Sequence, residues 1–279
     1  MTWRRLERHR WRLPVLAVAA TCGCGGDAAS RTPSDFVGQW VWSARDSTLL
    51  QAVRRQRSTV PAAIWVATLV RRGDSLSVQL GRPVDPSVGA DAELVIRIDD
   101  SFSSWWGLVP DDTLASWVGD RIARVLRLTD DAAHRRPVQL DYDAPVTRLP
   151  QYAAMVRRLR RGEGGQLRGR SLWVTSLVAH LAHPDYGPLF RSIVDGQIVQ
   201  LFDTGDPYSA RAARQLATRL DRAGLPFRVG LGAFERRLVT GSTTHRAWFD
   251  FIDIASRSRL FRGIWIFPAG ESYVAYLGG

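Results

Sequence analysis

Short apolar segments alternate with amphipathic ones along most of the chain, and this alternation is the strongest constraint on its fold. Eight segments have the length and apolar content of buried strands, and helix candidates separate most of them. Strands that alternate with helices build a parallel sheet, and eight such units in about 240 residues match one (β/α)8 TIM-type barrel. The strand candidates are 39–43, 62–70, 93–99, 137–143, 171–176, 197–202, 226–232 and 263–267.

Capping and stop residues flank the helix candidates. Asp46 is expected to cap 49–57, Asp111 or Asp112 to cap 114–128, Pro150 to open 152–161, and Gly224 to end 209–223, with shorter helices at 186–194 and 243–256. The second β/α unit is irregular, because Ser75–Leu80 follows a Gly-Asp turn and is typical of a β-hairpin. The alternative fold, a doubly wound open sheet, needs a phosphate-binding glycine fingerprint, and none follows a strand candidate. No cofactor is therefore predicted.

The first 24 residues have the pattern of an export signal, with a basic region, an apolar region at 13–20 and small residues after it. Both cysteines of the chain lie at its end, which favours a lipoprotein signal. Gly23 before Cys24 suits lipidation at Cys24 better than Thr21 suits Cys22; plain secretion is the alternative. We expect a signal peptide at 1–24, a flexible tether at 25–35, a barrel domain at 36–279 and a location in the cell envelope, anchored to the membrane.

The strong positive charge does not by itself indicate a nucleic-acid partner. All 38 basic residues are arginine, the formal net charge is +11, and the chain has neither Lys nor Asn. This composition is typical of a G+C-rich genome, and an exported protein rarely meets nucleic acid. With both cysteines in the signal, thiol chemistry in the mature domain is excluded.

Polar side chains alternate along the fourth strand candidate. Strand geometry places Gln139, Asp141 and Asp143 on one face, and in a barrel this polar set points inward. The two carboxylates then lie toward the C-terminal end of the strand, where barrel enzymes have their active sites. We predict Asp141 and Asp143 as the catalytic pair, one acting and the other raising its pKa by repulsion. The alternative is a buried ion-pair network.

The preceding strand carries a possible partner for this pair. Arg97 and Asp99 share the inward parity, so Arg97 is expected to reach Asp141 inside the barrel. Asp141 is the deeper carboxylate and is better placed to meet Arg97, whereas Asp143 is better placed to meet a ligand. We therefore predict that Asp141→Asn mainly lowers stability and that Asp143→Asn mainly removes function.

Further polar and aromatic residues are candidates for substrate binding. Asp203, Glu235 and Glu271 each end a later strand, and any of them is a possible distal carboxylate. Gly230 and Gly232 lie on the inward parity of the seventh strand and leave room in the mouth, unless they only relieve packing. Flat apolar faces for sugar rings are expected at Trp105 and Trp106 in an apparent loop, whereas core packing is expected of Trp40, Trp42, Trp173 and Trp265.

A metal site is not predicted from the histidines. His180 and His183 follow the fifth strand together with Asp185, but a metal site needs at least three converging ligands, and no third His or Cys is nearby. His180 remains a candidate for substrate binding, together with Arg97, Asp99, Gln139 and Gln200 on the strand candidates.

The segment PVQLDYDAPVTRLPQYAAMVRRLR (137–160) resembles the signature of an uncharacterised bacterial family, domain of unknown function 3142. Val194-Asp195 and the piece Ile198 to Gln200 extend the similarity over about 36–270. The resemblance implies an exported or lipid-anchored barrel of the glycoside-hydrolase type, with the two aspartates as its most distinctive residues. Chitinase-type hydrolases place a Glu two positions after the last Asp, and Pro145 stands there, so chitinase chemistry is not inherited.

Two functional hypotheses follow. The first is a glycoside-hydrolase-like enzyme acting on a polysaccharide or glycoconjugate. The second is a carbohydrate-binding or envelope-assembly lipoprotein that keeps the barrel without catalysis. A second carboxylate about 5 to 9 Å from Asp143 in an open mouth favours the first. An Asp141 carboxylate whose charge and hydrogen bonds are fully met by Arg97 in a closed interior favours the second.

Overall fold

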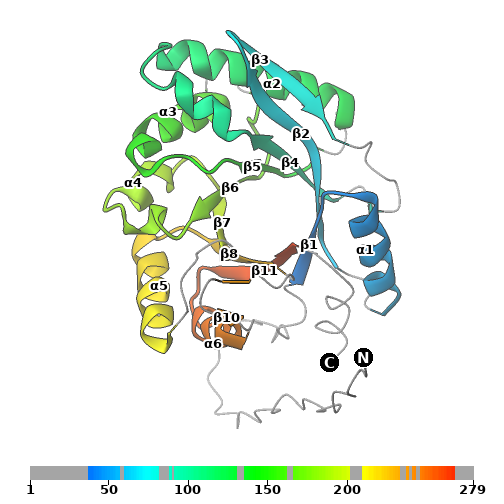
Figure 1. Ribbon diagram of the computed structural model, residues 1–279, viewed down its shortest axis with the longest axis vertical. Coiled ribbons are helices and arrows are strands. Elements are labelled where there is room, and N and C mark those ends of the chain that lie inside the picture. The colour runs from blue at the N-terminus through cyan, green and yellow to red at the C-terminus, as the bar shows by residue number, and fades with distance from the viewer. Residues whose placement is uncertain are drawn as a thin grey trace, which may run out of the picture.

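Eight parallel strands close into a barrel in the computed structural model (Figure 1). β1 pairs with β11 on one side and with β2 on the other, which closes the sheet. Around the ring the strands are β1 (Val37–Val41), β2 (Ala62–Arg72), β4 (Glu93–Ile98), β5 (Val138–Asp141), β6 (Leu172–Leu177), β7 (Gly196–Gln200), β8 (Phe227–Gly232) and β11 (Phe261–Phe267). The predicted (β/α)8 barrel is confirmed.

The structure describes ten segments of the chain. These are residues 37–56, 60–81, 88–89, 91–130, 135–161, 166–201, 209–232, 237–238, 241–242 and 246–267. The predicted signal, Cys24 and the tether at 25–35 lie outside them. None of the helices in these segments is long and apolar enough to cross a membrane.

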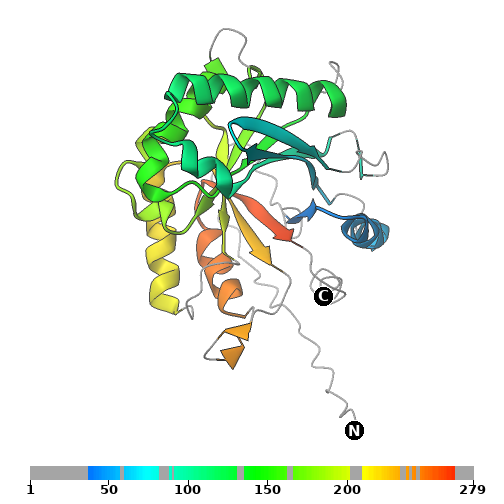
Figure 2. The same cartoon turned by 45° about the horizontal axis from the view of Figure 1, so that its top comes forward.

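Helices lie around the outside of the barrel (Figure 1 and Figure 2). They are α1 (Ala44–Gln56), α2 (Asp111–Thr129), α3 (Leu149–Arg161), α4 (Tyr186–Phe190), α5 (Ala210–Ala223) and α6 (Arg246–Ala255), with 3-10 helices η3 (Asp100–Trp105), η4 (Val146–Arg148) and η5 (His180–Ala182). The predicted hairpin is β3 (Ser75–Leu80), antiparallel to β2. A short pair, β9 (Arg237–Leu238) and β10 (Gly241–Ser242), precedes α6.

Two of the predicted helix caps are wrong. Asp46 lies inside α1, where its carboxylate accepts from the backbone N–H groups of Trp42 and Ser43 at 2.9 and 2.8 Å. The Ser43 hydroxyl accepts from the Asp46 N–H in return, so the two form a reciprocal capping box and α1 begins earlier than expected. Pro110 precedes α2, and both acidic candidates lie in its first turn.

Helix α5 follows the sequence prediction closely. Ser209 accepts from the backbone N–H of Ala212 at 3.2 Å, and Gly224 ends the helix in the left-handed conformation with φ of 64°.

Three tryptophans fill the interior of the barrel, and each lies against a glycine. Trp173 packs over Gly196 of the neighbouring strand, where a β-carbon would overlap the indole. Trp265 packs in the same way over Gly38. Core packing of these indoles was predicted and is confirmed, since each is less than 8% exposed.

Gly230 does not leave room in the mouth as predicted. A β-carbon there would lie 2.8 Å from the Trp40 ring, so the residue provides space for that indole. The alternative reading, that this glycine relieves packing, is correct.

An ion pair forms the floor of the barrel, at the N-terminal end of the strands. Arg228 of β8 contacts Glu93 of β4 at 2.7 Å, and its guanidinium lies 3.7 Å from the Trp173 ring centroid. Gln139 donates to Glu93 at 2.6 Å and accepts from the Trp40 indole N–H at 2.9 Å. The inward orientation of Gln139 was predicted, but the residue belongs to this floor and not to the mouth. Its role in substrate binding is therefore not supported.

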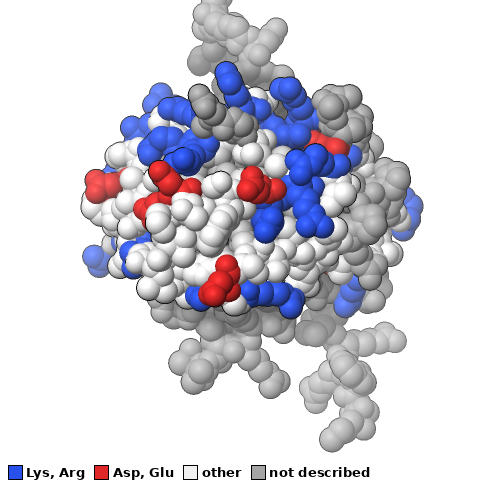
Figure 3. Space-filling view, turned by 90° about the horizontal axis from the view of Figure 1, so that it is seen from above, with Lys and Arg blue, Asp and Glu red and all other residues white. Residues whose placement is uncertain are grey.

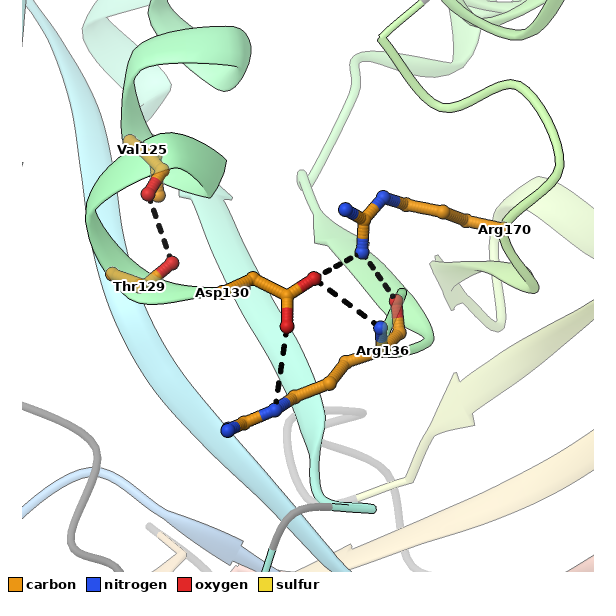
Figure 4. A network of polar contacts seen from close by, with 5 residues as sticks. All are labelled: Val125, Thr129, Asp130, Arg136 and Arg170. Atoms are coloured by element: carbon orange, nitrogen blue, oxygen red, sulfur yellow. Dashed lines mark hydrogen bonds and ion pairs between the residues drawn. The ribbon is translucent and has the colours of Figure 1, made fainter. Parts of the chain in front are cut away.

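A second polar network lies outside the barrel at the same end (Figure 4). Asp130 follows α2, and its side chain is fully buried. Its carboxylate contacts Arg170 at 2.5 Å and the Arg136 side chain at 3.4 Å, and accepts from the Arg136 backbone N–H at 3.3 Å. Arg170 also donates to the Arg136 carbonyl at 3.1 Å. One carboxylate thus joins the end of α2 to the entries of β5 and β6.

Candidate functional site

The C-terminal ends of the strands, here called the mouth, bring three predicted residues together. Asp141 ends β5, and Arg97 of β4 is its direct neighbour in register. Gln200 ends β7 and donates from Nε2 to Asp141 Oδ1 at 3.1 Å. Asp141 is only 6% exposed, whereas Arg97 and Gln200 are half-buried. A buried carboxylate at the mouth therefore lies between an amide and a guanidinium.

The environment of Asp141 favours its protonated form. Burial raises the pKa of the carboxyl above its ordinary value of 3.8, and this effect exceeds the opposing one from the Arg97 charge. Hydrogen bonds from Thr175 and Gln200 also oppose it. A carboxyl with a raised pKa can hold a proton and deliver it to a ligand.

Arg97 acts on Asp141 through its charge at a distance, and the direct ion pair that the sequence predicts is not formed. Among the described residues, Arg97 forms no ion pair; its guanidinium lies 5.8 Å from the Trp42 ring centroid instead. Arg97 is thereby held at the mouth beside the carboxylate. A half-buried cation in this position can reach a ligand.

Two stacked indoles form an aromatic wall beside Arg97. Trp42 and Trp65 stack with centroids 5.7 Å apart and planes 7° apart, and the Trp65 N–H donates to Thr68 at 3.0 Å. Both are half-buried and line a pocket of about 360 Å³ between β1, β2 and the first turns of α1. Core packing was predicted for Trp42, and Trp65 was missed. The signal for Trp65 is its shared parity with inward-facing Ala63.

Asp143 lies beyond the end of β5, because the strand stops at Asp141 and not at 143 as predicted. It is half-buried. The segment that follows is held by two bonds: the Ala144 N–H donates to the Tyr142 carbonyl at 2.9 Å, and the Ala144 carbonyl accepts from His180 at 2.7 Å. The backbone beside this second aspartate is therefore fixed.

His180 supports this segment and does not face a ligand. The residue is 1% exposed, and its Nδ1 accepts from the Leu177 N–H at 3.2 Å while Nε2 contacts the Ala144 carbonyl. Burial lowers the pKa of the imidazole below 6.5. Both ring nitrogens are thus occupied by backbone groups, and a contact of this residue with substrate is not supported.

Trp105 and Trp106 are not exposed as predicted, so they present no flat face for a sugar ring. The two indoles are 3% and 4% exposed, since Phe102 packs edge-on against both. Trp106 donates to the Tyr142 hydroxyl at 2.9 Å. Asp99 begins η3 by accepting from the Ser101 N–H at 3.0 Å, and bonds to Ser101 lower the pKa of its carboxyl.

The remaining predicted carboxylates, Asp203, Glu235 and Glu271, lie outside the described residues. Within the described segments, no group of three or more His, Cys, Asp or Glu residues is placed to hold a metal ion.

Comparison with solved structures shows the same fold in carbohydrate-active proteins. A GH18 chitinase from Pseudoalteromonas aurantia aligns with a TM-score of 0.57 and 10% identity over 87% of this chain and 99% of that one. A spore cortex-lytic enzyme from Bacillus megaterium aligns with a TM-score of 0.56 and 10% identity, over 87% and 72%. Both comparisons support the (β/α)8 barrel as the fold of this chain.

The same barrel also occurs in an inhibitor. A xylanase and α-amylase inhibitor protein from Scadoxus multiflorus aligns with a TM-score of 0.52 and 13% identity, over 87% of this chain and 96% of that one. No protein-family model and no curated protein matches the chain. The fold is therefore shared with proteins of different function, and the activity has to be argued from the mouth.

Proposed function

We propose that the protein is an exported, lipid-anchored barrel that acts on a polysaccharide or glycoconjugate in the manner of a glycoside hydrolase. The observation that carries this proposal is Asp141, a desolvated carboxyl with a raised pKa at the C-terminal end of a barrel strand. Glycosidic bonds are cleaved with the help of such an acid, which protonates the leaving oxygen.

The neighbours of Asp141 suit this role. Gln200 donates to one carboxylate oxygen and fixes the orientation of the group. Arg97 provides positive charge beside it after the proton has left. The Trp42–Trp65 wall offers apolar surface for a sugar ring, and Asp143 is the second carboxylate in the proposed pair.

The test is a screen of the chain from residue 25 onward against chromogenic glycosides and a glycan array. Turnover by the wild type that is lost in Asp141→Asn supports the proposal. A matched variant, Asp120→Asn, removes an exposed carboxylate on the outer helix α2 and should retain turnover. Turnover that survives Asp141→Asn contradicts the assignment of the acid.

A second candidate function is carbohydrate binding without catalysis. Pro145, which is exposed and precedes η4, occupies the position where chitinase-type hydrolases carry a glutamate. Glycan binding without turnover on any glycoside, retained in Asp141→Asn, supports this candidate over the first.

Export and anchoring are proposed from the signal sequence, since Cys22 and Cys24 are the two cysteines of the chain. Cells labelled with a lipid precursor should incorporate the label in wild type and not in Cys24→Ser. Retention of label in Cys24→Ser with loss in Cys22→Ser would move the anchor to Cys22. Absence of label in wild type would contradict anchoring.

A further inference from the structure

Arginines line a groove at the N-terminal end of the strands, here called the base of the barrel, opposite the mouth. The groove has a volume of about 540 Å³. Its charged residues come from the end of α3, the turn before β6 and the segment between α4 and β7. They are Arg160, Arg161, Arg168, Arg191 and Asp195. Four cations and one anion leave a net charge of +3 among the described residues of the groove.

The contacts within the groove hold the guanidinium groups without cancelling their charge. Arg160 is the exception, because it pairs with Asp195 at 3.0 Å. Arg161 and Arg191 donate to the backbone carbonyls of Ser192 and Ala223, which are neutral acceptors. Arg168 is exposed and makes no hydrogen bond or ion pair with the described part of the chain. Three exposed arginines are therefore available to an external anion.

Positive charge continues beyond the groove. Arg135 is exposed and lies beside Gly169, one of the lining residues. In the network of Figure 4, a single carboxylate, Asp130, serves both Arg136 and Arg170, which leaves one further positive charge. On the side of the molecule seen in Figure 3, basic side chains crowd the upper part of the view, while acidic ones are few.

The base is also the end at which the chain enters the barrel. β1 begins there at Val37, because all eight strands of the barrel are parallel. Residues 25–36 would join a lipidated Cys24 to this end, and a chain of that length extends at most about 45 Å. A membrane that held the anchor would therefore always be within reach of the base.

We propose that the arginine groove binds the phosphate headgroups of anionic phospholipids, so that the base rests on the membrane and the mouth faces away from it. Guanidinium groups match phosphate in geometry and charge, and anionic leaflets attract clustered basic residues. The choice of lipid as the anion rests on the proposed anchoring. The binding itself depends only on the groove, so it is testable without the anchor.

The test uses the chain from residue 24 onward with Cys24→Ser, which contains every strand of the barrel. Flotation with vesicles of phosphatidylglycerol and phosphatidylcholine should recover the protein at low salt and release it at high salt, and vesicles of phosphatidylcholine alone should not recover it. The variant Arg161→Gln, Arg168→Gln, Arg191→Gln should partition about 100-fold less, at about five-fold for each arginine.

A matched variant removes the same charge at the mouth. Arg45→Gln, Arg72→Gln, Arg148→Gln changes three arginines near the C-terminal ends of the strands and should keep most of the binding. Equal loss in both variants, or binding unchanged in the groove variant, would overturn the proposal. Melting curves establish that each variant is folded, and glycan binding measured in parallel separates failure here from failure of the proposed function.

The orientation of the barrel on the membrane is measured in a separate experiment. Since Cys22 and Cys24 are absent from this chain, a fluorophore can be placed through Ser171→Cys at the base, outside the groove, or Ala44→Cys at the mouth, both exposed positions. A quencher in the bilayer should quench the dye at the base and spare the dye at the mouth. The reverse pattern, or equal quenching, would contradict the orientation.

Discussion

Glu93 and Arg228, which are 135 positions apart in the chain, form the ion pair that floors the barrel. Their side chains are 10% and 15% exposed, and the Arg228 guanidinium also lies between the rings of Trp173 and Trp265, at 3.7 and 5.0 Å from the two centroids. Removing one partner of such a pair leaves the other charge buried and unneutralised. Removing both together leaves no buried charge.

Glu93→Gln should therefore destabilise the protein by about 3 to 5 kcal/mol, as broken buried pairs commonly do. The double variant Glu93→Gln, Arg228→Met should recover much of that loss. Denaturant unfolding of the two single variants and the double variant gives the coupling energy. Additive effects would show that the two side chains do not stabilise each other.

Contacts between strands that are far apart in the chain could not be predicted from the sequence. Parity placed Gln139 inside the barrel, but its partners Glu93 and Trp40 depend on the stagger of strands around the ring. The same holds for Trp265 over Gly38. Eight strands, the hairpin and the helix order were predictable because period and punctuation are local properties. Register across a closed sheet is not local.

At the mouth too, some features were predictable from the sequence and others were not. The sequence predicted Asp141, Arg97 and Gln200 as site residues, and the structure brings them together. Trp105 and Trp106 were expected to be exposed because their segment has no strand or long-helix pattern. A short 3-10 helix started by Asp99 turns them into the core instead.

The packing of Trp173 over Gly196 gives a second prediction. Gly196→Ala should lower the melting temperature by several degrees, because the added methyl overlaps a buried indole that cannot move away. Trp173→Leu in the Gly196→Ala background should restore part of the loss by making room. If Gly196→Ala melts like wild type, the indole is not held against this strand.

The aromatic wall gives a third prediction, for carbohydrate binding. Trp42→Ala removes the stacking partner of Trp65 and the ring under Arg97, so affinity for the best glycan on the array should fall about ten-fold or more. Trp117→Ala is the matched control, since it removes a half-buried indole on α2. An equal loss of affinity in both variants would mean that the effect is one of folding.

His180 gives a fourth prediction, a loss of stability in mild acid. Burial lowers its pKa in the folded protein below 6.5, so the neutral ring stabilises the fold above that pH, and this contribution is lost as the pH falls through the folded value. The melting temperature of the wild type should fall more between pH 7 and pH 5 than that of His180→Gln, which cannot titrate. Parallel curves for the two proteins would show that protonation of this ring does not matter.

The pH dependence expected from Asp141 has the opposite sign, and its raised pKa predicts the reverse of the stability effect that the sequence suggests. Burial raises the pKa of its carboxyl in the folded protein, so its contribution to stability is complete below the unfolded pKa and is lost as the pH rises through the folded one. At pH 7 the ionised carboxylate therefore destabilises the folded protein. An asparagine keeps an oxygen that can accept the Gln200 bond and carries no charge.

Asp141→Asn should consequently melt at or above the wild-type temperature at pH 7, and the difference between the two proteins should shrink toward pH 4. Turnover should be lost in the same variant, which separates function from folding. A variant that melts well below wild type at pH 7 would show that Arg97 stabilises the ionised carboxylate. The pairing predicted from sequence would then be correct, and Asp141 would be a structural residue with no proton to donate.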